Sequence, residues 1–341
     1  MSRARLKPLA SQTIVITGAS SGIGLATAEA AARAGASVVM TARNADALAE
    51  AKARIEAAGG KVEIVAVDIA EPDAADRIAA AAIARFGGFD TWVNNAAVAP
   101  IGRVVDTPVD DQRRTFDVGY WGTVRGSLAA LAHLRTRGGA LINLGSIESD
   151  RAVLLQATYS AMKHAIRGFT DAFRTEIEAD GLPVSVTLIT PAAIHTPFPE
   201  HARNFTGHPV TLPPVIYDPR LVARAILFAA ANPRRTLSVG GTGVLATVLA
   251  QHFPRLTDLA LERFGEAVQT FDKPAPADRA DNMWETRATA IDSKQDVYVR
   301  THSLWLEAQI RPWLAVGLAG AALAGLAVAK RSAAAITRGN A

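Results

Sequence analysis

Between Thr13 and Leu188, short apolar runs alternate with longer alanine-rich segments, and this alternation constrains the fold more than any other feature. Most of the short runs are apolar throughout, which is typical of strands buried on both faces of a parallel sheet. The longer segments between them, such as 24–34 and 45–58, have the composition of helices. The sequence therefore predicts an α/β fold, a doubly wound parallel sheet with a ligand crevice at the carboxyl ends of its strands. The candidate strands are 13–17, 37–42, 62–68, 91–94, 140–144 and 184–188.

After Pro191 the composition changes. Residues 191–219 contain seven prolines, together with His195, His201 and His208. A long irregular segment of this kind in a compact protein often forms a lid or binding loop. A helix over 219–231 and a strand over 236–239 are expected next. We divide the chain into a catalytic domain (1–250), a helical or irregular extension (251–311), an apolar segment (312–331) and a tail (332–341).

The apolar segment has no charged residue from Trp313 to Ala329. As a helix its 17 residues would span about 25 Å, somewhat less than the ~30 Å of a bilayer core. Gly317, Ala321 and Gly325 recur every fourth residue, which allows close helix packing in lipid. We favour a membrane-associated helix over 313–329, and the alternative is a buried or dimer-packing helix.

Composition excludes several kinds of site. The chain has no cysteine, which rules out disulfides, thiolate metal sites and cysteine nucleophiles. The net charge is +4, but the basic residues are scattered and form no nucleic-acid-reading motif, so we expect no nucleic-acid partner. The spacing of the three lid histidines fits no metal-ligand pattern, so we expect no metal. The N-terminal residues lack the apolar run of a secretory signal, and we expect a cytoplasmic catalytic domain.

A glycine-rich string, TGASSGIG at residues 17–24, follows the first candidate strand and opens the first helix. Glycines permit a tight turn and let the backbone approach a pyrophosphate, while the helix N-terminus offers free N–H groups. This position predicts a Rossmann-type dinucleotide site. The expected contacts are Gly18, Ser20, Ser21, Gly22, Ile23 and Gly24.

The end of the second strand indicates which dinucleotide binds. An acidic residue there would bind a ribose 2′-hydroxyl, but residues 40–44 read MTARN and contain no acid. The guanidinium of Arg43 can pair with a 2′-phosphate. We therefore predict NADP(H) as the preferred cofactor and keep NAD(H) as the alternative. The other interpretation of Arg43 is a solvated residue at a helix start.

Three residues have the chemistry for hydride transfer between nicotinamide and a carbonyl/alcohol pair. Tyr159 and Lys163 are four residues apart and share a helix face, and Ser146 follows the strand at 140–144. Carbonyl reduction needs a hydrogen-bond donor for the oxygen and a proton donor. We assign these roles to Ser146 and Tyr159. The ammonium of Lys163, together with the positive nicotinamide of the oxidised cofactor, is expected to lower the pKa of Tyr159.

Together these motifs resemble the short-chain dehydrogenase/reductase family over about residues 9–240. The resemblance rests on TGASSGIG (17–24), NNAA (94–97), Ser146, YSAMK (159–163) and the segment from Pro191 to Thr196. It implies a Rossmann-type oxidoreductase acting on a small-molecule carbonyl or alcohol. It places Asp68 near adenine, Asn95 at the exit of the central strand and Thr196 near the nicotinamide carboxamide. It also implies a homo-oligomer formed through surface helices. From the residues alone, Asp68 could simply cap a turn, and Asn95 could be turn chemistry.

Two positions depart from the family pattern. Gly119 stands where the family usually has an asparagine that bends a helix and positions a water in the proton relay, and Ala192 replaces a frequent glycine. Either a water fills the space beside Gly119 or activity is slow. The alternative function is accordingly a low-turnover cofactor-binding scaffold or redox sensor at a membrane. A third reading is another reaction on the same fold, such as an epimerase or dehydratase.

The substrate end is predicted to be apolar, which favours a hydrophobic carbonyl or alcohol. Glu148 is expected either to contact a polar substrate group or to be solvated. The residues expected to line the apolar pocket and its lid are Val153, Leu154, Leu155, Phe198, Phe205 and Leu212.

Overall fold

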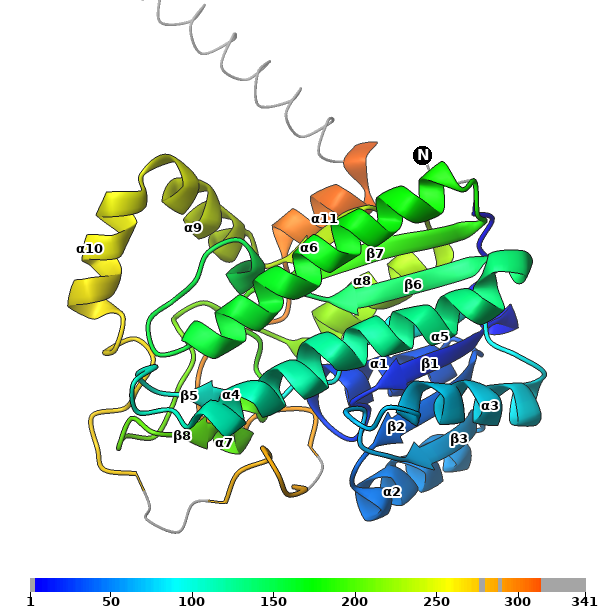
Figure 1. Cartoon of the computed structure of the whole chain (residues 1–341), viewed down its shortest axis with the longest axis horizontal. Coiled ribbons are helices and arrows are strands. Elements are labelled where there is room, and N and C mark those ends of the chain that lie inside the picture. The colour runs from blue at the N-terminus through cyan, green and yellow to red at the C-terminus, as the bar shows by residue number, and fades with distance from the viewer. Residues whose placement is uncertain (1–3, 276–279, 288–289, 314–341) are drawn as a thin grey trace, which may run out of the picture.

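The computed structural model describes residues 4–275, 280–287 and 290–313, and these form a parallel sheet flanked by helices (Figure 1). The strands of the sheet are β1 (Thr13–Thr17), β2 (Ser37–Ala42), β3 (Lys61–Ala66), β4 (Thr91–Asn94), β6 (Gly139–Leu144), β7 (Val184–Pro191) and β10 (Thr236–Val239). Their order is β10-β7-β6-β4-β1-β2-β3, and every neighbouring pair is parallel. The predicted doubly wound sheet is confirmed.

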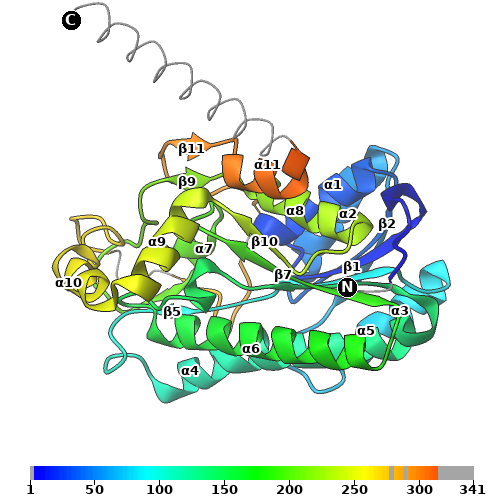
Figure 2. The same ribbon diagram turned by 90° about the horizontal axis from the view of Figure 1, so that it is seen from above.

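Helices cover both faces of this sheet. One face carries α1 (Gly22–Arg33), α2 (Ala45–Ala57) and α8 (Pro219–Ala231). The other carries α3 (Ala74–Phe86), α5 (Gly122–Arg137) and α6 (Ala157–Ala179), with α4 (Val109–Phe116) against α6. Figure 2 shows the sheet between these two layers. Successive residues of β1 alternate between the two cores: Ile14 and Ile16 belong to the first, and Val15 belongs to the second.

The strand order reverses at the centre of the sheet. β1 pairs with β2 on one side and with β4 on the other, so the chain leaving β1 and the chain leaving β4 diverge to opposite halves. A crevice opens at the carboxyl ends of strands at such a point. The glycine-rich turn after β1 and the segment after β4 both lie there.

Most predicted strand ends agree with the structure, but β7 runs to Pro191 instead of ending at Leu188. Its last residues pair with the edge strand β10, in register from Leu188 with Thr236 to Pro191 with Val239. This long-range pairing extends the strand through a proline that the local sequence would place in a loop.

The C-terminal extension packs on the sheet and on the active-site side of the domain. Its helices are α10 (Pro254–Phe264) and α11 (Leu304–Ile310), and α9 (Gly241–His252) leads into it. The side chain of Gln309 accepts from Ser238 N–H and donates to Ser238 O, so that α11 covers the outer edge of β10. The proposed domain boundary at residue 250 falls in the last turn of α9.

Short strands and short helices connect the main elements. The two-stranded pairs are β5 (Pro100–Ile101) with β8 (Arg203–Asn204) and β9 (Ile216–Tyr217) with β11 (Val299–Arg300). The short helices are η1 (Leu9–Ser11), η2 (Asp117–Trp121), η3 (Ile147–Ser149) and α7 (Phe198–His201).

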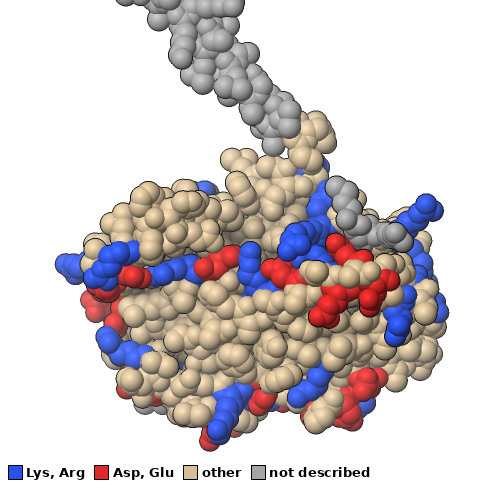
Figure 3. Space-filling view, turned by 45° about the horizontal axis from the view of Figure 1, so that its top comes forward, with Lys and Arg blue, Asp and Glu red and all other residues tan. Residues whose placement is uncertain are grey.

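Beyond Trp313, the predicted membrane-associated segment lies outside the described residues. Within the described part of the chain, no helix combines the length and hydropathy needed to cross a bilayer. On the face shown in Figure 3, Lys and Arg side chains are interspersed with Asp and Glu. Figure 3 shows no large patch of one sign on that face.

Candidate active site

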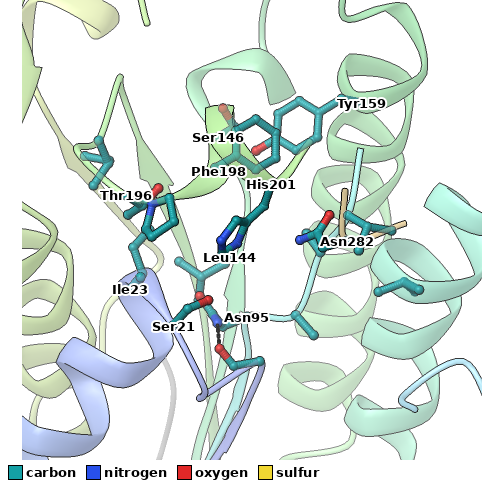
Figure 4. Close-up of a pocket in the computed structure, with 18 of the residues that line it drawn as sticks. Ser21, Ile23, Asn95, Leu144, Ser146, Tyr159, Thr196, Phe198, His201 and Asn282 are labelled. Atoms are coloured by element: carbon teal, nitrogen blue, oxygen red, sulfur yellow. Dashed lines mark hydrogen bonds between the residues drawn. The ribbon is translucent and has the colours of Figure 1, made fainter. Parts of the chain in front are cut away.

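A cavity of about 320 Å³ opens at the carboxyl ends of β1, β4 and β6 (Figure 4). A volume of this size is at the lower end of the range for small-molecule sites. The predicted catalytic residues Ser146, Tyr159 and Lys163 all line it. The predicted cofactor residues that also line it are Gly18, Ser20, Ser21, Gly22, Ile23, Arg43, Asp68, Asn95 and Thr196. Gly24 does not line the cavity.

The glycines of the turn after β1 have different roles. Gly18 has φ +65°, and a Cβ there would lie 2.8 Å from the Cα of Ala96. A Cβ on Gly24 would lie 2.1 Å from the carbonyl oxygen of Gly18, so Gly24 allows close packing of helix on turn. The side chain of Ser21, at the N-cap of α1, makes no capping hydrogen bond. The Gly22 N–H at the start of α1 donates to Ala290 O (2.8 Å), so a phosphate bound at this N–H would have to displace that contact.

Asn95 joins the exit of β4 to the glycine-rich turn. Its side-chain amide donates to Thr17 O (2.9 Å) and Gly18 O (3.1 Å), as Figure 4 shows in part. Its own N–H donates to the Thr17 hydroxyl. Asn95 thus fixes the turn on which a pyrophosphate would rest.

Arg43 does not present a free guanidinium to the cavity. Its two terminal nitrogens donate to four carbonyl oxygens of residues 282–285, including Trp284 O at 3.1 Å and Glu285 O at 3.0 Å. The expected pairing of Arg43 with a 2′-phosphate therefore stays a prediction, and the structure gives this side chain another partner.

Asp68 caps a turn and also lines the cavity, so both interpretations of this residue from the sequence agree with its position. Its Oδ1 caps the following turn by accepting from Ala70 N–H (3.0 Å), and its Oδ2 pairs with Arg114. The carboxylate also lines the cavity. Because Arg114 compensates its charge, Asp68 opposes a phosphate less than a bare carboxylate would.

The predicted catalytic side chains converge from the start of η3, where Ser146 is the N-cap, and from α6. Figure 4 shows the Tyr159 hydroxyl directed toward Ser146. Lys163 is buried; its Nζ donates to Leu144 O (2.7 Å) and lies 5.5 Å from the centre of the Tyr159 ring. Burial lowers the pKa of Lys163 to about 8, and the charge of Glu148 acts in the opposite direction.

The pKa of Tyr159 moves against expectation. Burial raises it, and the negative charge of Glu148 raises it further, whereas the hydrogen bond with Ser146 lowers it. The lowering expected from Lys163 does not contribute to this shift, and the largest cause is desolvation, which disfavours the phenolate. Tyr159 therefore holds its proton at neutral pH.

Glu148 is buried and not solvated. Its Oε2 accepts from the Ser160 hydroxyl (2.6 Å), and its N–H donates to the Ser146 hydroxyl (3.1 Å). Burial raises the pKa of Glu148 to about 7, although Ser160 and Lys163 each lower it. Its place beside Ser146 could be suspected from the sequence, but its burial could not.

The substrate end is partly as predicted. Val153, Phe198 and Leu212 line the cavity, and the Phe198 ring lies 5.4 Å from that of Tyr159. Leu155 instead packs in a small core with Ile101. Leu154 and Phe205 also lie away from the cavity lining: Leu154 flanks the same core, and Phe205 packs over Gly102.

Among the lining residues that were not predicted as site residues are four polar ones from the lid and the extension. They are His201, Asn282, Thr286 and Arg287. His201 was considered only as a metal ligand, and the described residues contain no cluster of three or more potential metal ligands. No periodicity or motif marks the other three in the sequence.

Comparison with known proteins agrees with this geometry. The model of the short chain dehydrogenase family matches residues 12–206, more than half of the chain. An L-sorbose reductase from Gluconobacter frateurii, solved with NADPH and L-sorbose, superimposes with a TM-score of 0.59 and 26% identity over 70% of this chain and 97% of that one.

Curated relatives include oxidoreductases from several bacteria. The uncharacterized oxidoreductase YxnA of Bacillus subtilis is 41% identical over 331 residues, covering 96% of this chain and 93% of that protein, so the likeness includes the C-terminal extension. The 1-deoxy-11-beta-hydroxypentalenate dehydrogenase of Streptomyces avermitilis is 36% identical over 58% of this chain and 74% of its own length. The chain is therefore a short-chain dehydrogenase/reductase, an oxidoreductase of the family that interconverts CH–OH and C=O groups.

Proposed function

We propose that this protein is an NADP(H)-dependent oxidoreductase that transfers a hydride between nicotinamide and a hydrophobic carbonyl or alcohol. The observation that carries the proposal is the meeting of the Ser146 and Tyr159 hydroxyls in the cavity, with Lys163 buried beside them. The bound nicotinamide would supply or accept the hydride.

The side chains would divide the remaining work. Ser146 donates a hydrogen bond to the substrate oxygen, and Tyr159 delivers its proton there during reduction. Lys163 keeps positive charge within 5.5 Å of the phenol ring and so stabilises the phenolate that forms. Asn95, the glycine-rich turn and Thr196 hold the cofactor.

Charge at the adenosine end supports NADP(H) over NAD(H). Arg43 and Arg287 line that end of the cavity, and the carboxylate of Asp68, whose charge acts on Arg43, is paired with Arg114. No acidic residue ends β2, where one would bind a free ribose 2′-hydroxyl. The structural neighbour from Gluconobacter was solved with NADPH, which fits this preference.

The apolar lining favours a hydrophobic substrate. Ile147, Val153, Phe198 and Leu212 line the cavity that contains the two hydroxyls. Such a wall would stabilise a bulky apolar carbonyl more than a polyol.

The test is NADPH oxidation with a panel of hydrophobic aldehydes and ketones, with a ketose sugar as polar control. We expect turnover with the apolar compounds, and we expect Tyr159→Phe to lose at least about 10²-fold in kcat while binding NADPH as wild type does. Full turnover by Tyr159→Phe would refute the catalytic assignment. Tight NADPH binding without turnover across the panel would favour the low-turnover scaffold. Three further predictions are untested. They are that the protein forms a homo-oligomer, that its catalytic domain is cytoplasmic, and that residues 313–329 associate with a membrane.

A further inference from the structure

A segment of the C-terminal extension lies against the cofactor end of the cavity. This segment, residues 280–287, is called the strap. In Figure 1 it is the orange loop between α7 and the end of β2. Asn282 N–H donates to His201 O (2.8 Å) on one side, and Asn44 donates its side-chain amide to Arg287 O (2.9 Å) on the other. The strap thus bridges the lid and the turn after β2.

Arg43 anchors the strap. Its guanidinium donates to the carbonyl oxygens of four consecutive strap residues, Asn282 to Glu285. A guanidinium holds its N–H groups in a fixed planar arrangement. Because four backbone carbonyls of the strap accept hydrogen bonds from this one group, the path of the strap backbone is fixed. Both terminal nitrogens of Arg43 are used in these contacts, and a 2′-phosphate would have to compete with them.

Two strap side chains tie it to the domain. The Met283 side chain has no exposed surface and belongs to the core that includes Val67 and Ile69. The Trp284 indole N–H donates to Asp111 Oδ1 (2.8 Å), and the Arg114 guanidinium lies 5.3 Å from the Trp284 ring centre. The strap is therefore a packed wall of the domain.

The strap also presents polar groups to the cavity. Asn282, Thr286 and Arg287 line it, and Figure 4 shows the Asn282 side chain facing the space beside His201. Asn282 Oδ1 is buried and has no hydrogen-bond partner. A buried acceptor without a donor is costly, and in a cavity wall it indicates a ligand that donates to it.

Arg287 is the basic residue of the strap, and its backbone is held by the turn after β2. Its Nε donates to Asp281 O (2.8 Å), and its Nη2 lies 3.9 Å from the exposed Glu285 carboxylate. Asn44, which follows Arg43, holds the Arg287 backbone. The guanidinium is thus placed beside the position at which the family fold selects between a 2′-hydroxyl and a 2′-phosphate.

We propose that the strap completes the dinucleotide site: Arg287 pairs with the 2′-phosphate of NADP(H), Asn282 accepts a hydrogen bond from the cofactor, and Arg43 holds the strap in place. This rests on the proposed NADP(H) dependence. It assigns cofactor selection to the extension as well as to the Rossmann-type domain.

The test is calorimetric titration of the full-length protein with NADPH and with NADH. Arg287→Gln should weaken NADPH binding about 10- to 100-fold and change NADH binding less than about twofold, since only NADPH carries the phosphate. Arg287→Lys should recover part of the loss. Asn282→Leu should weaken both cofactors. The matched control is Arg135→Gln, an exposed arginine on α5, which should change neither.

Arg43→Gln separates an anchor from a phosphate ligand. If Arg43 anchors the strap, Arg43→Gln should weaken the binding of both NADPH and NADH. It should also increase amide hydrogen exchange in the strap. Selective loss of NADPH binding in Arg43→Gln, with no change in Arg287→Gln, would overturn the proposal. If wild type binds NADPH and Arg287→Gln binds it equally well, the strap assignment alone is wrong. If wild type binds neither dinucleotide, the proposed function fails and this inference fails with it.

Discussion

The thioether of Met162 occupies the space beside Gly119. A Cβ on Gly119 would lie 2.6 Å from the Met162 sulfur and 2.8 Å from its terminal methyl. Gly119 belongs to η2, a π-helical turn between α4 and α5, and such turns often occur at functional sites. At the position where the family resemblance implies an asparagine, this chain has Gly119 packed against Met162 of α6. Met162 takes the space that a Cβ at this position would need, and the water expected beside Gly119 stays a prediction.

Gly119→Ala should destabilise the protein when Met162 is present. Overpacking a core typically costs about 1–3 kcal/mol, which outweighs the roughly 1 kcal/mol that alanine gains over glycine in a helix. In a Met162→Ala background the same substitution should become stabilising, because the clash is removed. Urea unfolding of the four proteins measures both effects. Stabilisation by Gly119→Ala in both backgrounds would show that the two side chains do not compete for this space.

Glu148 should make the folded protein less stable as pH rises. Its pKa is about 7 in the folded state against an ordinary 4.5, so between these values the folded state binds the extra proton. This contribution is fully present below pH 4.5 and is lost as pH rises through 7. The difference corresponds to about 3 kcal/mol.

Glu148→Gln should remove most of that slope. The free energy of unfolding of the variant should change little between about pH 5 and 8, while wild type loses stability over the same range. The matched control is Glu176→Gln, an exposed position on α6, which should keep the wild-type slope. An unchanged slope in Glu148→Gln would contradict the burial of this carboxyl.

The contrast between Glu148 and Lys163 shows what the sequence can and cannot predict at the site. Lys163, Tyr159 and Ser146 were predictable because helix spacing and the end of a strand fix their positions locally. The burial of Glu148 depends on packing of η3 against α6, which no local pattern encodes. The position of the strap was even less predictable from the sequence. Trp284 is 241 residues from Arg43, and no periodicity marks the residues around it.

The same reasoning applies to the fold. The central strands were predictable because burial on both faces makes them apolar throughout. The extra length of β7 was not, because it depends on pairing with β10 and on the extension that covers that edge. Local composition thus predicts which elements form, while their ends and their distant partners depend on tertiary contacts.

Lys163 should set the alkaline limb of the pH profile for carbonyl reduction. Burial lowers its pKa to about 8, so the ammonium that supports Tyr159 is lost as pH rises through that value. We expect kcat/KM, which reports the free enzyme, to fall above about pH 8. In Lys163→Arg the guanidinium stays charged, and any remaining activity should keep its value to higher pH. Identical alkaline limbs in the two proteins would exclude Lys163 as the titrating group.

Phe198 should determine affinity for the apolar part of the substrate. Its ring lies 5.4 Å from that of Tyr159 and lines the cavity from α7, on the lid. Phe198→Ala removes apolar wall from that end, and a loss of about 1 kcal/mol of contact corresponds to a roughly fivefold rise in KM for a bulky ketone. Phe198→Leu should retain most of the affinity. NADPH binding should stay unchanged in both variants, because the dinucleotide contacts come from the glycine-rich turn and the β2 side. A larger effect on NADPH affinity than on ketone KM would place Phe198 against the cofactor and move the substrate end elsewhere in the cavity.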